Sequence, residues 1–384
     1  MRSRVALVSL VGMVAVPIAL LAMTHTSMPS DMEIPASGPS IGARVSQAPT
    51  QPEATDRTVT WVPPQHDRRV EHQASPDARL GAGEADAEGG EEETGDARLS
   101  GGLGEPAPGV GDPLKATILV AGDIASCAWT SDSATARLVD SLPGVVMTAG
   151  DNAYQYGTYR EFRDCYGPTW GRFRERTRPT PGNHEWYTPG AEGYFRYFGA
   201  LAGPAKRGYY AFDAGAWRVY ALTSDCSSVG GCRNGTPQNT WLRKDLADHP
   251  RQCVLAVWHR PRFSSGTHGS SPRGNALLKV IYRAGGDVVV NGHDHIYERF
   301  APARPDGSPD QDFGIRQFIV GTGGAPLYAI ERPYAPNSRV RDATSHGVLR
   351  LTLEADRYAW EFLPVPGDTL RDQGSGTCHG APPQ

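Results

Sequence analysis

The chain has 384 residues, a formal net charge of −4 at pH 7 and six cysteines. A charge this close to neutral predicts no attraction to nucleic acid or to an acidic membrane surface, so we expect no nucleic-acid partner. An even number of cysteines suits an exported protein with a few disulfides.

The first residues have the layout of an export signal. Arg2 and Arg4 supply positive charge, and residues 5–23 are uncharged and largely apolar. This pattern is typical of a secretory signal, although a run of this length could also remain as an uncleaved membrane anchor. We therefore predict a signal peptide or anchor at residues 1–26 and an exported protein, either secreted, periplasmic or tethered on the outer side of a membrane through that anchor.

Residues 27–112 lack a sustained apolar period and are rich in Pro, Ala, Gly, Ser and Glu. Between Glu84 and Asp96 there are seven acidic residues and no basic one. Such a segment cannot bury enough apolar surface to offset the entropy of ordering it. We predict a disordered, low-complexity spacer over residues 27–112, followed by one catalytic domain with a short C-terminal tail at residues 113–384.

From Pro113 onward, short β-rich runs alternate with amphipathic stretches, which favours an α/β fold. Residues 133–141 and 240–247 have the pattern of helices. Three late runs, at residues 317–320, 348–353 and 358–362, are expected to be strands of a closing sheet. Five earlier runs are expected to be the strands that matter most for function: residues 117–121, 145–149, 178–181, 254–258 and 288–290.

Each of these five runs is followed at once by side chains that bind metals. Ligands bind outside the carboxyl ends of strands in α/β sheets, so five strand ends with oxygen and imidazole donors point to one site. The glycines before the donors let the backbone turn sharply. A single Gly-Asp is an ordinary turn, but this ordered series is a much more specific signal. The segments are Gly122-Asp123, Gly150-Asp151-Asn152-Ala153-Tyr154, Gly182-Asn183-His184-Glu185, His259 and Gly292-His293-Asp294-His295.

The types of donor indicate which metals fit. Carboxylate, amide and imidazole groups without a thiolate suit Fe, Mn or Zn rather than a structural zinc site. A carboxylate shared by two ions is the arrangement that holds the attacking and leaving oxygens at phosphorus. Seven protein donors for two ions would leave positions open for water and phosphate, which is typical of a catalytic site.

The series GD…GDNAY…GNHE…H…GHDH resembles the calcineurin-like metallophosphoesterase superfamily. Tyr154, three residues after Asp151, and the segment Tyr297-Glu298-Arg299 resemble more narrowly the purple acid phosphatases. The resemblance implies an α/β, four-layer sandwich of two packed β-sheets flanked by helices. It also implies a centre of two metal ions at the strand ends.

By this resemblance, seven residues would hold the two ions. The first ion would be Fe(III), because Tyr154 would supply a phenolate, and the second would be Fe, Zn or Mn. His184 and His268 match positions that contact the substrate phosphate and assist the leaving group. The implied ligands are Asp123, Asp151, Tyr154 and His295 at the first ion, with Asp151 bridging, and Asn183, His259 and His293 at the second.

Considered one at a time, several of these residues could have an ordinary structural role instead of binding metal or substrate. His259 alone would be read as a packed histidine, His268 lies in a polar loop where exposed histidines are common, and Tyr154 could be a surface aromatic. Asp294 and Glu185 could either orient imidazoles or simply begin helices.

We therefore predict an exported phosphoester hydrolase, a phosphomonoesterase of the purple acid phosphatase type acting on a small phosphate ester. Two cations lower the pKa of a bound water, so that hydroxide can attack phosphorus in line. The alternatives are a phosphodiesterase or nucleotidase on the same site, a relative that binds metal without turnover, and an extracellular structural domain with a coincidental motif series. Asp123 is followed by Ile124, where the family pattern usually has glycine, so substrate preference does not follow from the resemblance.

Six cysteines allow fifteen pairings. Cys226 and Cys232 bracket a small Gly/Ser loop and are the preferred pair. Two further disulfides are expected by position. Cys127 with Cys165 would connect the first two metal-bearing loops, and Cys253 with Cys378 would anchor the tail.

Overall fold

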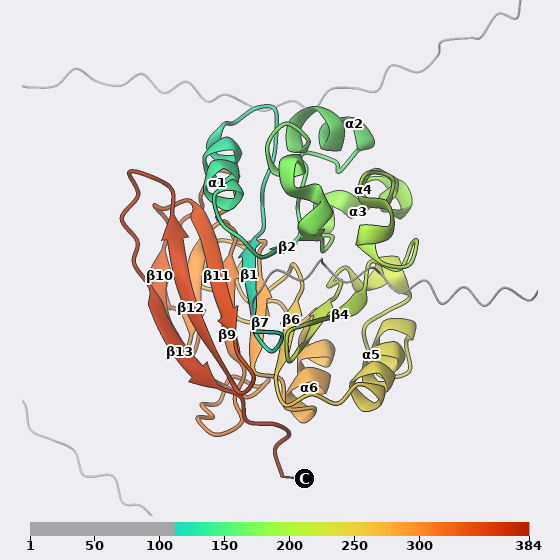
Figure 1. Cartoon of the computed structure of the whole chain (residues 1–384), viewed down its shortest axis with the longest axis vertical. Coiled ribbons are helices and arrows are strands. Elements are labelled where there is room, and N and C mark those ends of the chain that lie inside the picture. Colours follow the sequence, from blue (N-terminus) through green and yellow to red (C-terminus); the bar gives the residue numbers. More distant parts are fainter. Residues whose placement is uncertain (1–111, 384) are drawn as a thin grey trace, which may run out of the picture. The chain divides into compact units, whose positions relative to one another are not determined.

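The computed structural model describes residues 112–383, and within this range no helix is long and apolar enough to cross a membrane. The expected export signal and all but the last residue of the expected spacer lie outside the described residues. The described part contains two mixed β-sheets flanked by helices (Figure 1), which confirms the expected α/β sandwich.

The first sheet has six strands in the order β13-β12-β11-β1-β2-β3. Strands β1, β2 and β3 run parallel, and β11 pairs antiparallel with β1 through Ile118 opposite Leu351. The bounds are β1 Ala116–Ala121, β2 Val145–Thr148, β3 Thr177–Arg178, β11 Gly347–Leu353, β12 Arg357–Pro364 and β13 Gln373–Thr377.

The second sheet has seven strands in the order β10-β8-β9-β7-β6-β5-β4. Strands β5, β6, β7 and β9 are parallel neighbours, whereas β4, β8 and β10 pair antiparallel. The bounds are β4 Tyr210–Ala214, β5 Trp217–Ala221, β6 Val254–Val257, β7 Val288–Asn291, β8 Tyr297–Phe300, β9 Arg316–Val320 and β10 Ser338–Asp342.

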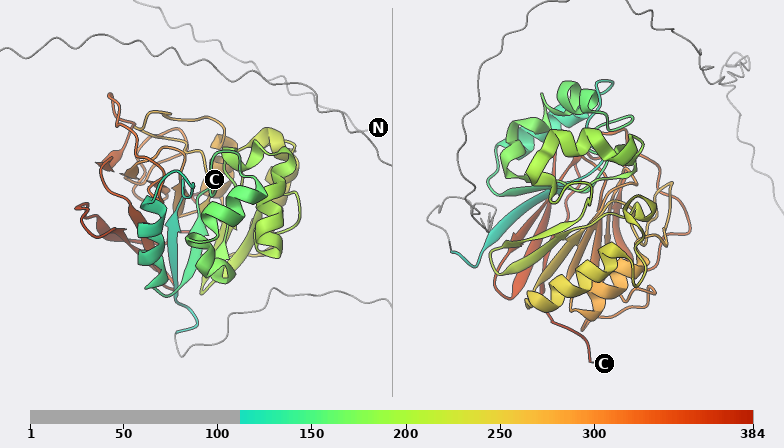
Figure 2. Two further views of the ribbon diagram at one scale, coloured as in Figure 1. Left: turned by 90° about the horizontal axis from the view of Figure 1, so that it is seen from above. Right: turned by 90° about the vertical axis from the view of Figure 1, so that its right-hand side faces the viewer.

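The helices form two groups, with α1–α4 at one end of the molecule in Figure 1 and α5 and α6 together beside the second sheet (Figure 2). The α-helices are α1 Ser131–Asp140, α2 Tyr159–Glu161, α3 Asn183–Trp186, α4 Glu192–Phe198, α5 Pro237–Asp248 and α6 Asn275–Arg283. Shorter or irregular helical turns are η1 Phe162–Tyr166, η2 Trp170–Arg176, η3 Pro189–Ala191, η4 Gly199–Ala202 and η5 Cys226–Val229.

The alternation of side chains along β6 shows how the second sheet is covered on both faces. Leu255 and Val257 enter the large core that also holds residues of the first sheet, whereas Val254 and Ala256 face the cluster that includes Leu242 of α5 and residues of α6. Because both faces are buried, β6 is apolar throughout. This packing fixes the strand, and therefore the position of His259 after its end.

Two expectations about the strands need correction. The expected strand at 178–181 pairs only as Thr177–Arg178, because Pro179 and Pro181 have no backbone N–H to donate to a ladder. The late runs do not form one closing sheet: β9 lies in the seven-stranded sheet, whereas β11 and β12 extend the six-stranded one. The two expected helices are present, as α1 and α5.

The three expected disulfides are confirmed. They join Cys127 to Cys165, Cys226 to Cys232 and Cys253 to Cys378. The first connects the loop after β1 to η1, and the last fixes the segment after β13 to the start of β6.

Candidate metal centre

The loops after β1, β2, β6 and β7 meet at one end of the two sheets. The backbone N–H of Asp123 donates to Gly150 O at 3.0 Å, and that of Gly292 donates to His259 O at 3.0 Å. His259 Nδ1 lies 2.8 Å from Ala149 O, which links the loop after β6 to the end of β2. The structure therefore brings together strand ends from both sheets.

Glycine is required where these loops approach one another. A Cβ on Gly150 would lie 2.6 Å from His259 Nδ1, and one on Gly182 would overlap the Asp151 side chain. Asp123, Asp151 and His293 themselves have positive φ, at 60°, 49° and 74°. Non-glycine residues in this conformation are uncommon and concentrate at functional sites, where the surrounding structure enforces them.

Asp123, Tyr154 and His295 form the first group of donors. The Tyr154 hydroxyl lies 3.0 Å from Asp123 Oδ1 and 3.2 Å from His295 Nε2. His295 Nε2 also lies 3.3 Å from Asp123 Oδ1. All three side chains are buried, so Tyr154 is an interior residue and not the surface aromatic of the plainer reading.

Asp151, His259 and His293 form the second group, with one ligand atom of each within 4.8 Å of the others. Asp151 Oδ2 is 3.0 Å from His259 Nε2 and 3.4 Å from the Tyr154 hydroxyl. This carboxylate oxygen therefore touches both groups of donors. Asn183 completes the seven expected residues and begins α3 directly after Gly182.

Unpartnered buried atoms test whether these residues fit metal ions. Within residues 112–383, Asn183 Oδ1 is buried without a hydrogen-bond partner, which is costly unless something else binds it, and buried His259 Nε2 has only the Asp151 carboxylate beside it. Since a carbonyl can only accept, the bonds to Ala149 O and Pro326 O place the proton of His259 and His295 on Nδ1. Both Nε2 atoms are then free to bind a cation, so the donor set fits the implied metals.

The charges in the site bear on which groups can be ionised. Burial opposes ionisation of Asp151, but His259 and His184 hold its pKa below the usual range. Burial and the carboxylates of Asp123 and Asp151 raise the pKa of Tyr154 well above its ordinary value. Burial also lowers the pKa of His293, and the nearby His259 adds to this effect. Phenolate at Tyr154 thus requires a bound cation, whereas His293 is already the neutral imidazole that a metal binds.

For His259, burial lowers the pKa, but the neighbouring carboxylate of Asp151 outweighs this effect and raises the pKa to about 10. Burial likewise acts against a charged His295, yet Asp123 raises its pKa above the ordinary value. Two imidazoles that attract a proton this strongly lie in a site of negative potential. A cation there would take the place of those protons.

Glu185 holds the metal-bearing backbone in place rather than orienting an imidazole. Its buried carboxylate accepts four backbone N–H bonds, from Gly182 at 2.7 Å, Asn152 at 2.9 Å, Asp151 at 3.0 Å and Ala153 at 3.3 Å. The same carboxylate caps the start of α3, so Glu185 is also the helix-start acid that the sequence analysis gave as an alternative.

The two histidines expected to assist the leaving group both lie beside the second donor group. His184 Nε2 is 3.7 Å from Asp151 Oδ2, and its Nδ1 lies 2.7 Å from Gln155 O. His268 is exposed and stacks on His293 with ring centroids 4.3 Å apart. Asp294 accepts from the His268 backbone N–H at 2.7 Å, so it positions the loop that carries His268.

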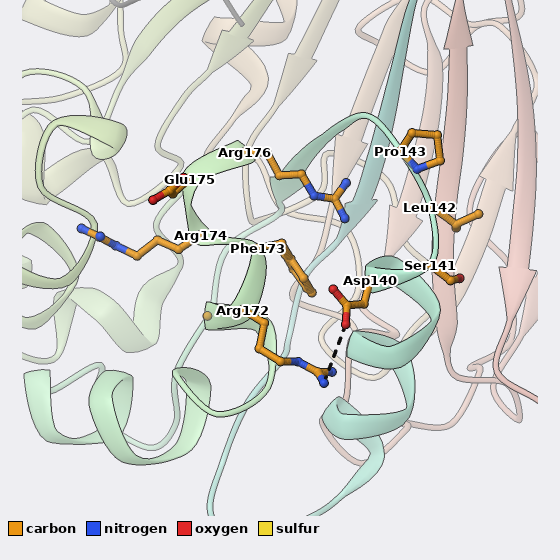
Figure 3. A pocket seen from close by; sticks show the side chains of 10 residues that line it. Asp140, Ser141, Leu142, Pro143, Arg172, Phe173, Arg174, Glu175 and Arg176 are labelled. Atoms are coloured by element: carbon orange, nitrogen blue, oxygen red, sulfur yellow. Dashed lines mark ion pairs between the residues drawn. The ribbon is translucent and has the colours of Figure 1, made fainter. Parts of the chain in front are cut away.

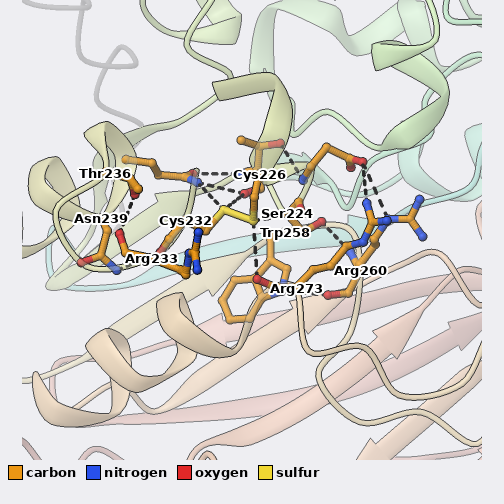
Figure 4. Close-up of a disulfide and its surroundings, with 12 residues drawn as sticks. Ser224, Cys226, Cys232, Arg233, Thr236, Asn239, Trp258, Arg260 and Arg273 are labelled. Carbon is orange, nitrogen blue, oxygen red and sulfur yellow. Dashed lines mark hydrogen bonds and ion pairs between the residues drawn. A yellow bond between two sulfur atoms is a disulfide. The ribbon is translucent and has the colours of Figure 1, made fainter. Parts of the chain in front are cut away.

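Arg260 is a residue that the motif analysis missed, although it directly follows His259. Its Nη1 donates to His293 Nε2 at 2.6 Å, and its Nε lies 3.7 Å from Asp225 Oδ1. The Arg260 backbone N–H donates to Ser224 Oγ at 2.9 Å, close to the disulfide between Cys226 and Cys232 (Figure 4). The loop after β5 therefore holds a guanidinium group at the candidate centre. Tyr187 and Tyr328, which contact Asn183 and His295, were also missed, because they lie outside the motifs.

A hollow of about 850 Å³ lies elsewhere, between the end of α1 and η2 (Figure 3). Two of its three arginines are paired with other groups of the protein. Arg172 pairs with Asp140 at 3.8 Å, and Arg176 donates to the carbonyls of Gly144 and Val139. None of the seven donors or the two histidines lines this hollow, so its size does not mark it as the reactive site.

Comparison with known proteins agrees with this arrangement. The sequence model of the calcineurin-like phosphoesterase family matches residues 116–297. Purple acid phosphatase 15 of Arabidopsis thaliana is 28% identical over 219 residues, which are 47% of this chain and 40% of the relative. Purple acid phosphatase 21 of the same plant is 28% identical over 285 residues, which are 63% of this chain and 58% of the relative. The chain thus spans about half the length of these curated relatives.

Among solved structures, the purple acid phosphatase PPD1 from yellow lupin (Lupinus luteus) seeds has a TM-score of 0.54 at 19% identity. The match covers 68% of this chain and 53% of the lupin chain, and at this identity it supports the fold alone. The family match spans all seven expected donors, from Asp123 to His295. Residues 116–297 therefore form a calcineurin-like phosphoesterase domain, and the chain is similar to the purple acid phosphatases.

Proposed function

We propose that the protein is an exported hydrolase of small phosphate monoesters that uses two metal ions. The observation that carries this proposal is the position of Asp151 Oδ2, within 3.4 Å of Tyr154 in one donor group and 3.0 Å of His259 in the other. A carboxylate shared in this way suits two neighbouring cations. Two bound cations would supply the Lewis acid and the activated water that the reaction requires.

In this proposal the seven donors divide as the family resemblance implies. Asp123, Tyr154 and His295 would bind the first ion, Asp151 would be shared by both ions, and the Tyr154 phenolate favours Fe(III) at the first. Asn183, His259 and His293 bind the second, which is Fe, Zn or Mn. Their backbone is fixed before any ion binds, because Glu185 ties the second and third loops together.

The remaining groups act on the substrate itself. His184, which lies beside Asp151, and His268, which stacks on His293, would donate hydrogen bonds to the phosphate or a proton to the leaving oxygen. Arg260 adds a fixed positive charge next to His293. A monoester phosphate carries more negative charge than a diester phosphate, so the positive charge of Arg260 favours binding of the monoester.

The test compares the full chain with Asp151→Ala and with Asp356→Ala, an exposed aspartate outside the centre. Elemental analysis should find two metal ions per chain in wild type and in Asp356→Ala, and a large loss in Asp151→Ala. Hydrolysis of p-nitrophenyl phosphate should disappear only in Asp151→Ala. Full activity of that variant would overturn the proposal.

Two further outcomes separate the alternatives. Faster hydrolysis of bis(p-nitrophenyl) phosphate than of the monoester would identify a phosphodiesterase, and two bound ions without hydrolysis of either would identify a metal-binding protein without turnover. A visible charge-transfer band that is lost in Tyr154→Phe would establish Fe(III) bound by tyrosinate. Colourless Zn or Mn protein would contradict the assignment of iron.

A further inference from the structure

We infer that Tyr156 and Tyr187 form an aromatic shelf that receives a planar aromatic leaving group. This inference rests on the proposed function and deepens it by naming a substrate class, monoesters of phenols and nucleosides.

Four rings lead outward from the donor groups to solvent. Tyr154 is 5% exposed, and its ring centroid lies 4.4 Å from that of His184. The next ring, Tyr187, is 4.8 Å from His184 and 54% exposed. Tyr156 follows at 6.5 Å and is 59% exposed. A substrate with its phosphate beside His184 would therefore extend its leaving group toward the aromatic shelf.

The aromatic shelf is connected to the candidate centre through the Tyr187 side chain and through the backbone of Tyr156. Asn183 Nδ2 donates to the Tyr187 hydroxyl at 3.0 Å. Thr188 Oγ1 donates to the backbone carbonyl of Tyr156 at 2.7 Å. A Cβ on Gly157 would lie 2.5 Å from Glu185 Cα, so the two loops are in direct contact at this point. The Tyr187 ring, fixed in this way, loses little conformational entropy when a ligand stacks on it.

Exposure of these two rings is unusual within this protein. In the range 112–383 only four large hydrophobic side chains are strongly exposed, and two of them are the aromatic shelf. The other two are Leu114 and Tyr334. The surface of two rings is far smaller than the roughly 800 Å² that each partner buries in a stable protein interface. They are instead the size of one aromatic group, with which aromatic rings interact favourably.

The experiment measures kcat/KM of the full-length metal-loaded protein for three monoesters: phenyl phosphate, adenosine 5′-monophosphate and glycerol 3-phosphate. Tyr156→Ala removes one ring whose side chain contacts none of the seven donors. We expect the ratio of aromatic to glycerol ester to fall about three- to tenfold, the size of one aromatic pair. Tyr334→Ala removes an exposed ring outside the candidate centre and should leave the ratio at its wild-type value.

The two aromatic esters distinguish the kind of leaving group that the aromatic shelf binds. If the kcat/KM ratio falls for phenyl phosphate alone, the shelf binds phenolic esters, and if it falls for the nucleotide alone, the shelf binds nucleotides. Either result supports the aromatic shelf, and an unchanged ratio for both overturns it.

A binding measurement keeps this test separate from that of the proposed function. Calorimetry should show that wild type binds phenylphosphonate more tightly than methylphosphonate, and that Tyr156→Ala loses most of the difference. Equal affinities in wild type would overturn the aromatic shelf even if monoesters are hydrolysed. Absence of all hydrolysis would overturn the proposed function, while tighter binding of phenylphosphonate would still support the aromatic shelf.

Discussion

Replacing Glu185 by Gln tests how the loops after β2 and β3 are held together. Each carboxylate oxygen accepts two backbone N–H bonds, Oε1 from Asn152 and Ala153, and Oε2 from Asp151 and Gly182. Burial and the Asp151 carboxylate raise the pKa of Glu185. However, only the ionised carboxylate can accept all four backbone N–H bonds. A proton on either carboxylate oxygen would point at two of these N–H donors.

The size of the effect follows from the same count. Glutamine has one acceptor oxygen, and its NH₂ group would face two backbone N–H donors. Each of these two buried donors left without a partner costs about 1–3 kcal/mol, so Glu185→Gln should lower the free energy of unfolding by about 2–6 kcal/mol. Since the backbone that moves carries Asp151, the variant should also bind metal less tightly.

Urea unfolding of the chelator-treated protein measures this difference without a contribution from bound metal. Glu175→Gln makes the same chemical change at an exposed position and should stay within about 0.5 kcal/mol of wild type. If Glu185→Gln also unfolds within about 0.5 kcal/mol of wild type, the carboxyl is protonated in the native protein, which would refute an ionised Glu185 that accepts all four N–H bonds.

Two predictions concern stability away from the centre. Burial raises the pKa of Asp287 to about 6, so its contribution to folding is fully present below pH 4 and is lost as pH rises through 6. Urea unfolding from pH 4 to pH 7 should show wild type losing up to about 3 kcal/mol relative to Asp287→Asn, and a constant difference would contradict this. Removing the disulfide between Cys253 and Cys378, 125 residues apart, should cost about 2.7 kcal/mol more than removing that between Cys226 and Cys232, six apart. Equal losses in thermal or urea unfolding would argue against the loop-entropy explanation.

Much of the candidate centre could be predicted because the metal donors lie in short segments. A glycine followed by Asp, Asn or His at the end of an apolar run needs only local geometry to place a donor at a strand end. Five such segments in order were enough to name seven residues that the structure brings to one place. The disulfides were also predictable, although the sequence left fifteen pairings open.

The sheet membership of the strands could not be predicted in the same way. Runs such as β9 and β11 have similar apolar patterns, and only packing against neighbours decides that one joins the second sheet and the other the first. The shortness of β3 could have been predicted from the sequence, because Pro179 and Pro181 exclude further strand pairing.

The amino-acid sequence by itself predicted the identity and order of the expected metal donors, because the residue types and the glycines beside them indicate which side chains can bind a cation at a strand end. Only the tertiary structure placed Arg260 against His293, Glu185 against four backbone N–H groups, and Tyr156 with Tyr187 at the edge of the centre. These contacts join segments with no common motif. They depend on how two sheets and their loops pack, which is a property of the whole fold and not of any one segment.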